Sequence, residues 1–108
     1  MSDIAQTSPV YVLVHGAWHG AWCWSRTIPA LTAMGVSAHA INLTGVGERA
    51  HLMHPSLDLE SHITDVMAAM DAEEMDEVVL VVHSYAGMLG TALADRRPER
   101  LRHLVYLD

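Results

Sequence analysis

Four short apolar runs divide the chain, and between them apolar positions recur at the three- and four-residue spacing of helices. The runs cover residues 10–15, 36–42, 78–83 and 103–108. Uninterrupted apolar runs of this length are typical of parallel strands that are buried on both faces. The chain is therefore expected to form a four-stranded parallel sheet.

The intervening segments predict three helices, which cover residues 24–34, 58–70 and 85–97. Each helix has a recognisable limit: Gly35 suits a left-handed helix end, Asp58 suits a helix N-cap, and Pro98 cannot extend the third helix. The segment 43–57, between the second strand and the second helix, is expected to be irregular. Strands and helices in alternation are typical of an α/β fold.

Right-handed crossovers in a doubly wound sheet predict the strand order 2-1-3-4. The chain direction then switches between the first and third strands, and ligands of open α/β sheets bind in the crevice at such a switch point. The stretch "HGAW" follows the first strand, and "HSYAG" ends the third. These two stretches are therefore expected to lie side by side at the crevice.

Composition and charge restrict the function further. The 108 residues suffice for one domain at most, and 51% hydrophobic with 18% charged residues indicates a globular chain. The net charge is −7 and the six arginines form no continuous stripe, which argues against nucleic acid or an anionic membrane as a partner. A lone Cys23, no apolar run of about 20 residues and an N-terminus without signal-peptide features predict a soluble cytoplasmic protein.

Ser84, at the end of the third strand, is the strongest candidate for chemistry. A serine hydroxyl becomes a nucleophile only beside a base, with donors to hold the oxyanion that forms. A sharp strand-to-helix turn exposes such a serine, and that turn needs small residues two positions before and two positions after it. Ala86 meets this requirement and Val82 does not. A serine in this place is also typical of a helix cap.

Four segments, "YVLVHGAWHGAWCW", "LTGVGERAHL", "VVHSYAGM" and "RPERLRHLVYLD", together resemble the N-terminal part of an α/β-hydrolase. Within that family they resemble the branch of small esterases, plant methylesterases and hydroxynitrile lyases. The resemblance implies that Ser84 is the nucleophile and that the backbone N–H groups of Ala17 and Tyr85 form the oxyanion hole. It also places Gly16 and Trp18 at the substrate and implies no cofactor.

The activity that the resemblance implies is that of a serine esterase, which cleaves a small ester through an acyl-enzyme. The family takes its triad histidine and acid from loops that would lie beyond residue 108. Residues 1–108 are therefore expected to form the N-terminal portion of a single α/β-hydrolase domain. A hydroxynitrile-lyase-like reaction is the alternative enzyme, and a non-catalytic half that acts only with its complement is the third hypothesis.

The predicted sheet supports the expectation of an incomplete domain. One helix would cover one face and two helices the other, so strands 78–83 and 103–108 are expected to be bare on one face. The last strand would also offer an unpaired apolar edge. Besides a small-molecule ester, the expected partner is therefore the remainder of the domain, or a second copy bound through that edge.

No histidine of the chain is expected to serve as the missing base. His83 adjoins Ser84 on a strand and should point to the opposite face, while the resemblance implies a structural role for His15. Asp108 ends the last strand but has no histidine to orient. The histidine pairs at positions 15 and 19 and at 51 and 54 lack an acidic partner in a recognised pattern, so no metal site is expected.

The other conspicuous side chains are expected to have structural roles. The tryptophans are interpreted as packing residues or pocket walls (Trp18, Trp22, Trp24), and three methionines as core or helix-face residues (Met67, Met70, Met75). Arg49 is expected to pair with Glu48 in the loop that connects the second strand to the second helix.

Overall fold

The structure is a computed structural model and describes residues 9–107. Its strands are β1 (Val10–Val14), β2 (Ser37–Ile41), β3 (Val78–His83) and β4 (Leu101–Leu107). They pair in parallel in the order β2-β1-β3-β4, which confirms the predicted topology. The carboxyl ends of the two central strands, β1 and β3, therefore lie at the same edge of the sheet.

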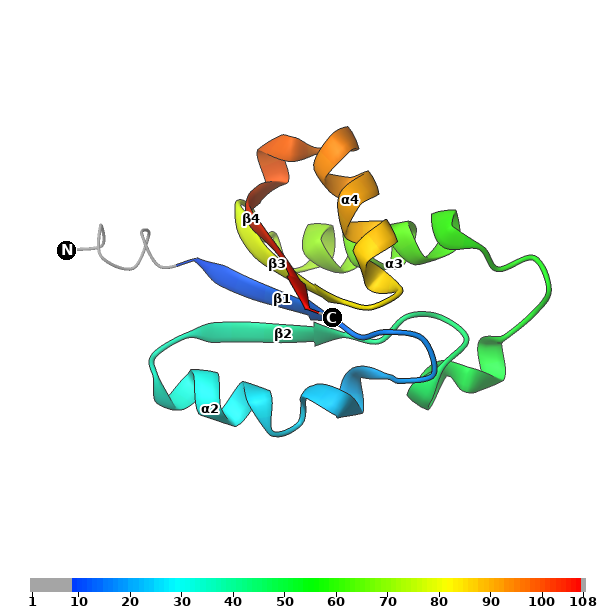
Figure 1. Ribbon diagram of the computed structural model, residues 1–108, viewed down its shortest axis with the longest axis horizontal. Coiled ribbons are helices and arrows are strands. Elements are labelled where there is room, and N and C mark those ends of the chain that lie inside the picture. Colours follow the sequence, from blue (N-terminus) through cyan, green and yellow to red (C-terminus); the bar gives the residue numbers. More distant parts are fainter. Residues whose placement is uncertain (1–8, 108) are drawn as a thin grey trace.

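Helical segments make the connections between the strands. They are η1 (Ala21–Trp24), α2 (Thr27–Ala33), η2 (Gly47–Leu52), α3 (Leu59–Ala72), α4 (Ala86–Arg96) and η3 (Pro98–Arg100). Figure 1 shows α2 on one face of the sheet and α3 and α4 on the other. This arrangement is the predicted doubly wound α/β architecture.

Three predictions about individual elements were wrong. The helix expected over 24–34 is broken, because the ring of Pro29 would clash with the carbonyl four residues earlier; the chain forms the 3₁₀ turn η1 and restarts as α2 at Thr27. The segment 43–57 is not wholly irregular, since it contains η2. Strand β4 begins at Leu101 rather than at residue 103, and Asp108 lies outside the described residues.

The expected helix limits are confirmed. Asp58 caps α3: its Oδ1 accepts a hydrogen bond from the Ser61 N–H at 3.0 Å, and the Ser61 hydroxyl accepts one from the Asp58 N–H at 3.2 Å. This reciprocal capping box satisfies two N–H groups that a helix end leaves unpaired. Gly35 follows α2 with a φ of 79°, a conformation that glycine adopts without steric cost.

Two apolar clusters, one on each face, form the core. The larger lies between the sheet and α3 and α4, and it includes Met70 and Met75 with Met67 packed against it, as expected. The smaller lies under η1 and α2 and joins Trp24 to Leu13 of β1 and to Val79 and Val81 of β3.

The smaller cluster overturns one expectation about the sheet. Strand β3 is not bare, because Val79 and Val81 are 4% and 7% exposed beneath η1 and α2. Among the strands of the described residues 9–107, the exposed apolar face belongs to β4, where Val105 and Leu107 are 37% and 42% exposed. Among residues 9–107, no helix is long and apolar enough to cross a membrane.

Candidate active site

Ser84 occupies a sharp turn between β3 and α4. Its φ is 55°, in the left-handed region that side chains other than glycine seldom adopt. Two backbone hydrogen bonds hold the turn: the Ser84 N–H donates to the Leu107 carbonyl at 3.1 Å, and the Gly87 N–H donates to the Ser84 carbonyl at 2.9 Å. The residue is exposed. Backbone strain at an exposed serine, directly before a helix, matches the geometry of a nucleophile elbow.

The turn tolerates Val82 because α4 supplies the missing space. Val82 is fully buried, and a Cβ placed on Gly90 of α4 would lie 3.0 Å from Val82 Cγ1 and 3.0 Å from Leu104 Cδ1. The absence of a side chain at Gly90 therefore lets α4 pack closely over the valine. The bulk that weakens the sequence motif is accommodated on the facing helix.

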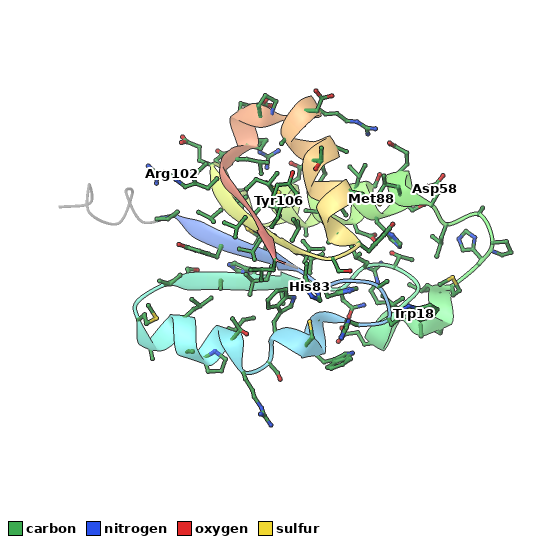
Figure 2. All side chains as sticks on the ribbon, in the orientation of Figure 1. Trp18, Asp58, His83, Met88, Arg102 and Tyr106 are labelled. Atoms are coloured by element: carbon green, nitrogen blue, oxygen red, sulfur yellow. The ribbon has the colours of Figure 1, made fainter. Side chains whose placement is uncertain are left out.

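Gly16 brings the loop after β1 into direct contact with the elbow. A Cβ on Gly16 would lie 2.9 Å from Ser84 Cβ and 2.9 Å from His83 Nδ1, closer than side chains pack. The expected proximity of "HGAW" and "HSYAG" is confirmed. Figure 2 shows Trp18 and His83, which belong to these two stretches, at the same end of the sheet.

A cavity of about 200 Å³ lies beside the elbow, and four residues predicted at the site line it. The lining residues are His15, Gly16, Ala17, Trp18, Leu43, Val46, His62 and Tyr85. Trp18 stands at the rim with 94% of its surface exposed and a φ of 68°. Ser84 is not among the lining residues, but it precedes Tyr85 and contacts Gly16, so it stands beside the cavity.

The backbone N–H groups of Ala17 and Tyr85 are the predicted donors of the oxyanion hole. Within residues 9–107, neither N–H donates a hydrogen bond, although the neighbouring N–H groups of Ser84, Gly87 and Met88 all do. Tyr85 is the N-cap residue of α4, at the helix end where the dipole favours negative charge. Donors of an oxyanion hole must not be bonded within the protein, and the role of these two groups stays a prediction.

His15 has a structural role, as the resemblance implied. It is 1% exposed; its Nδ1 bonds to the Gly16 carbonyl at 2.8 Å, and its Nε2 accepts the Leu43 N–H at 3.1 Å. Both ring nitrogens are therefore occupied in a neutral ring that joins the β1 and β2 loops. Burial, together with the nearby rings of His19 and His62, lowers the pKa of His15.

His62 is a site residue that the sequence did not indicate. It lies on α3 and lines the cavity, its Nδ1 is 2.8 Å from the Tyr85 hydroxyl oxygen, and its Nε2 is 3.0 Å from the Thr44 carbonyl oxygen. Its partners are 23 and 18 residues away in the chain, so no local pattern marks them.

Arg49 has partners other than the predicted Glu48. Its guanidinium donates to the Asn42 carbonyl at 3.1 Å and lies 3.8 Å from the Asp65 carboxylate. The Asn42 carbonyl at the end of β2 and the Asp65 carboxylate of α3 therefore hold the Arg49 guanidinium. Through these contacts Arg49 orders the loop against β2 and α3.

Trp22 also differs from the expectation of a packing or wall residue. It is 60% exposed and absent from the cavity lining, and its ring lies 5.5 Å from the ring of His19 with the two planes tilted by 43°. In the 3₁₀ turn η1, Trp22 and Trp24 point in different directions, and only Trp24 enters the core.

No base reaches Ser84 within the part of the chain that the structure describes. The expectation that His83 points to the face opposite Ser84 was wrong, because the left-handed φ of Ser84 ends the strand alternation and both His83 Nδ1 and Ser84 Cβ approach Gly16. The His83 ring packs edge-on against His19, with 5.9 Å between ring centroids, and among residues 9–107 it makes no hydrogen bond to the Ser84 hydroxyl. In the same residues, no group of three or more His, Cys, Asp or Glu side chains could hold a metal ion. The described residues thus bring together an exposed serine at a strained turn, two backbone N–H groups without an internal acceptor, and a cavity of about 200 Å³.

Comparison with known proteins identifies the family. The model of the alpha/beta hydrolase family matches residues 11–108. The chain belongs to the alpha/beta hydrolase family. This alpha/beta hydrolase chain is 52% identical over 98 residues to the carbendazim hydrolyzing esterase of Nocardioides sp. (strain SG-4G), a match that covers 91% of this chain and 40% of the relative. It is 36% identical over 100 residues to methylesterase 10 of Arabidopsis thaliana, which covers 91% of this chain and 36% of that protein.

Solved structures of the family share its fold. The epoxide hydrolase VrEH1 of Vigna radiata superposes with a TM-score of 0.80 at 28% identity, over 94% of this chain and 33% of that one. An extracellular alpha/beta-hydrolase from a Paenibacillus species superposes with a TM-score of 0.82 at 21% identity, over 91% of this chain and 39% of that one. This alpha/beta hydrolase chain therefore spans about 40% or less of the length of these relatives.

Proposed function

We propose that this chain carries the nucleophile and the oxyanion hole of a carboxylic-ester hydrolase. The observation that carries the proposal is the strained, exposed Ser84 beside two free N–H groups, those of Ala17 and Tyr85, at the mouth of a cavity. The relatives named as a carbendazim hydrolyzing esterase and as a methylesterase support an ester as the substrate class.

The reaction begins with attack of Ser84 Oγ on the ester carbonyl carbon. The hydroxyl proton passes to a base outside the described residues, and the carbonyl oxygen becomes an oxyanion that accepts hydrogen bonds from the Ala17 and Tyr85 N–H groups. Collapse breaks the C–O bond and releases the alcohol, which takes up the proton. Water then attacks the acyl-enzyme and frees the acid and Ser84.

The cavity favours a small acyl group. Its 200 Å³ are bounded by Trp18, Leu43, Val46 and the rings of His62 and Tyr85. The ring nitrogens of the lining histidines His15 and His62 are already hydrogen-bonded within the protein, so the walls offer mainly apolar surface. A short or flat apolar acyl group fits such a pocket.

The test is hydrolysis of short-chain p-nitrophenyl esters by the full-length protein. Ser84→Ala should lower kcat to less than about one thousandth, because removal of the nucleophile leaves only the oxyanion hole and binding. Ser25→Ala, at an exposed serine of another segment, should leave kcat unchanged. Full turnover in the Ser84→Ala variant would refute the proposal.

A further inference from the structure

The hydrogen bonds of His62 fix its tautomer. Its Nε2 lies 3.0 Å from the Thr44 carbonyl oxygen, which can only accept, so Nε2 carries the proton. In the neutral ring Nδ1 is then an acceptor, and the Tyr85 hydroxyl, 2.8 Å away, donates to it. The pair is a directed relay from Tyr85 through His62 to Thr44. The two rings also meet edge to face, with centroids 5.7 Å apart.

The end of this relay is anchored to α3. The Thr44 N–H and hydroxyl donate to the two oxygens of the Asp65 carboxylate at 2.7 and 2.8 Å. Asp65, whose side chain is 12% exposed, follows His62 by three residues on α3. All three polar groups of Thr44, its N–H, hydroxyl and carbonyl, therefore bond to residues of α3. The carbonyl that accepts the hydrogen bond from His62 is held in place by the other two bonds.

The start of the relay is the residue on which the proposed chemistry depends. Tyr85 follows the nucleophile, its backbone N–H is one of the two free donors, and its ring is a wall of the cavity. Its side chain makes its hydrogen bond to His62 across the gap between α4 and α3. The Tyr85 hydroxyl thus provides a hydrogen bond from α3 to the residue that directly follows the nucleophile.

We propose that His62 is a positioning residue for acyl transfer: through the Tyr85 hydroxyl it holds the Tyr85 backbone donor and the cavity wall in the geometry that the transition state needs. The inference rests on the proposed function, because it assigns the partner that supports the oxyanion donor of that same site. Positioning of this kind is expressed in the rate of the chemical step, since the ground-state substrate makes weaker use of the donor.

The experiment measures inactivation of the full-length protein by a fluorophosphonate, in which Ser84 Oγ displaces fluoride at phosphorus. Tyr85→Phe and His62→Leu should each lower the limiting inactivation rate constant about tenfold, a part of the loss expected for a whole oxyanion donor, with the half-saturating concentration unchanged. The double variant should be no slower than either single variant, because both remove the same hydrogen bond.

The matched control is Tyr106→Phe. It removes a tyrosine hydroxyl that is also hydrogen-bonded, to Thr91 Oγ1 at 2.6 Å, but between β4 and α4 rather than between α3 and the elbow. Its rate constant should equal that of the wild type. A merely structural loss would lower the fraction of protein that can be labelled and leave the rate constant of that fraction unchanged, so amplitude and rate separate the two roles.

Two conservative variants test which ring nitrogen matters. His62→Asn places an amide oxygen near the position of Nδ1 and can still accept from Tyr85, whereas His62→Gln places an amide nitrogen near the position of Nε2 and can only bind Thr44. The proposal predicts that asparagine restores most of the rate and that glutamine does not. Equal rates in the wild type and Tyr85→Phe, or rescue by glutamine alone, would overturn it.

The relay has a readout that is independent of activity. Nitrogen-15 NMR of the His62 ring should show a proton on Nε2 and none on Nδ1 in the wild type, and an altered Nδ1 signal in Tyr85→Phe. If Ser84 is never labelled, the proposed function fails and the positioning role falls with it, whatever the NMR shows. If Ser84 is labelled but the variants react at the wild-type rate, only the positioning role fails.

Discussion

At the residue scale, the site depends on two backbone requirements: a left-handed φ at Ser84 and the absence of a Cβ at position 16. Ser84 holds a left-handed φ of 55°, at a cost of about 1–2 kcal/mol, and Gly16 lies against it with no room for a Cβ. Strain that persists at an exposed serine needs support from its surroundings, and the hydrogen bonds to Leu107 and Gly87 supply it. The geometry around Ser84 therefore accounts for the glycine at position 16.

Gly16→Ala tests this contact. The added methyl group would meet Ser84 Cβ and His83 Nδ1 at 2.9 Å, so the loop and the elbow must separate, at a cost of about 1–3 kcal/mol in unfolding free energy and with loss of fluorophosphonate labelling. Gly87→Ala is the control: its Cβ would meet only the Tyr106 ring, at 3.5 Å, and in helix α4 it should leave stability unchanged or raise it by up to about 1 kcal/mol. Urea unfolding measures both; equal losses would contradict the account.

His15 predicts a pH dependence of stability. Its folded-state pKa lies below the ordinary value of 6.5, so between these values the unfolded chain binds the extra proton. The stabilisation by neutral His15 is therefore complete above about pH 6.5 and is lost as the pH falls towards the lowered pKa. The difference in unfolding free energy between wild type and His15→Gln should shrink between pH 7 and pH 5. A difference that stays constant over that interval would show that His15 does not titrate this way.

At the scale of elements, the close approach of α4 to β3 positions the elbow. Val82 of β3 lies two residues before the nucleophile and faces Gly90 of α4. A Cβ on Gly90 would lie 3.0 Å from Val82 Cγ1, so the two elements approach closely because Gly90 has no side chain. The Val82 side chain, which the sequence motif would exclude, thus fits into the space that Gly90 leaves on α4. The helix start, and with it the Tyr85 N–H, is placed by this contact.

Gly90→Ala and Val82→Ala form a mutant cycle across that contact. Gly90→Ala should destabilise by about 1–3 kcal/mol, because its methyl group would lie 3.0 Å from Val82 Cγ1 and Leu104 Cδ1. In the double variant the two volume changes offset each other, so it should be more stable than the sum of the single changes by about 0.5–3 kcal/mol. Thermal or urea unfolding measures the coupling, and strict additivity would mean that the two residues do not share the space.

The elements and their order could be predicted from the sequence, because apolar runs mark buried parallel strands and crossover handedness fixes the order. The break between η1 and α2 was also accessible in principle, since Pro29 excludes a helix that starts at Trp24. The placement of Ser84, Ala17 and Tyr85 followed from the family resemblance. His62 could not be found, because its role depends on the packing of α3 against the elbow, and Val82 was misjudged because its compensation at Gly90 is visible only in three dimensions.

At the scale of the whole molecule, one surface distinguishes this chain from a closed domain. On β4, Val105 and Leu107 point away from α4 and are 37% and 42% exposed, beside a strand edge that no segment of residues 9–107 pairs with. The neighbouring strand β3 is covered by η1 and α2, so the bare surface is confined to the last strand. The relatives have more than twice the length that this chain matches.

The 108-residue chain expressed by itself should therefore self-associate. An apolar face with an open edge pairs with a second copy at concentrations of about micromolar and above. Val105→Glu combined with Leu107→Glu should shift the sedimentation coefficient to that of a monomer, whereas Met34→Glu, at a residue 74% exposed on another element, should not. A wild-type chain that sediments as a monomer throughout the range would contradict this expectation.

The most direct test of the central claim, that Ser84 is an activated nucleophile, is the intact mass of the protein before and after treatment with a fluorophosphonate. The account predicts a single adduct on the full-length protein, with the mass of the phosphonyl group, and no adduct on Ser84→Ala. An unmodified wild-type protein, or an adduct that persists in Ser84→Ala, would show that the elbow geometry at Ser84 does not serve acyl transfer.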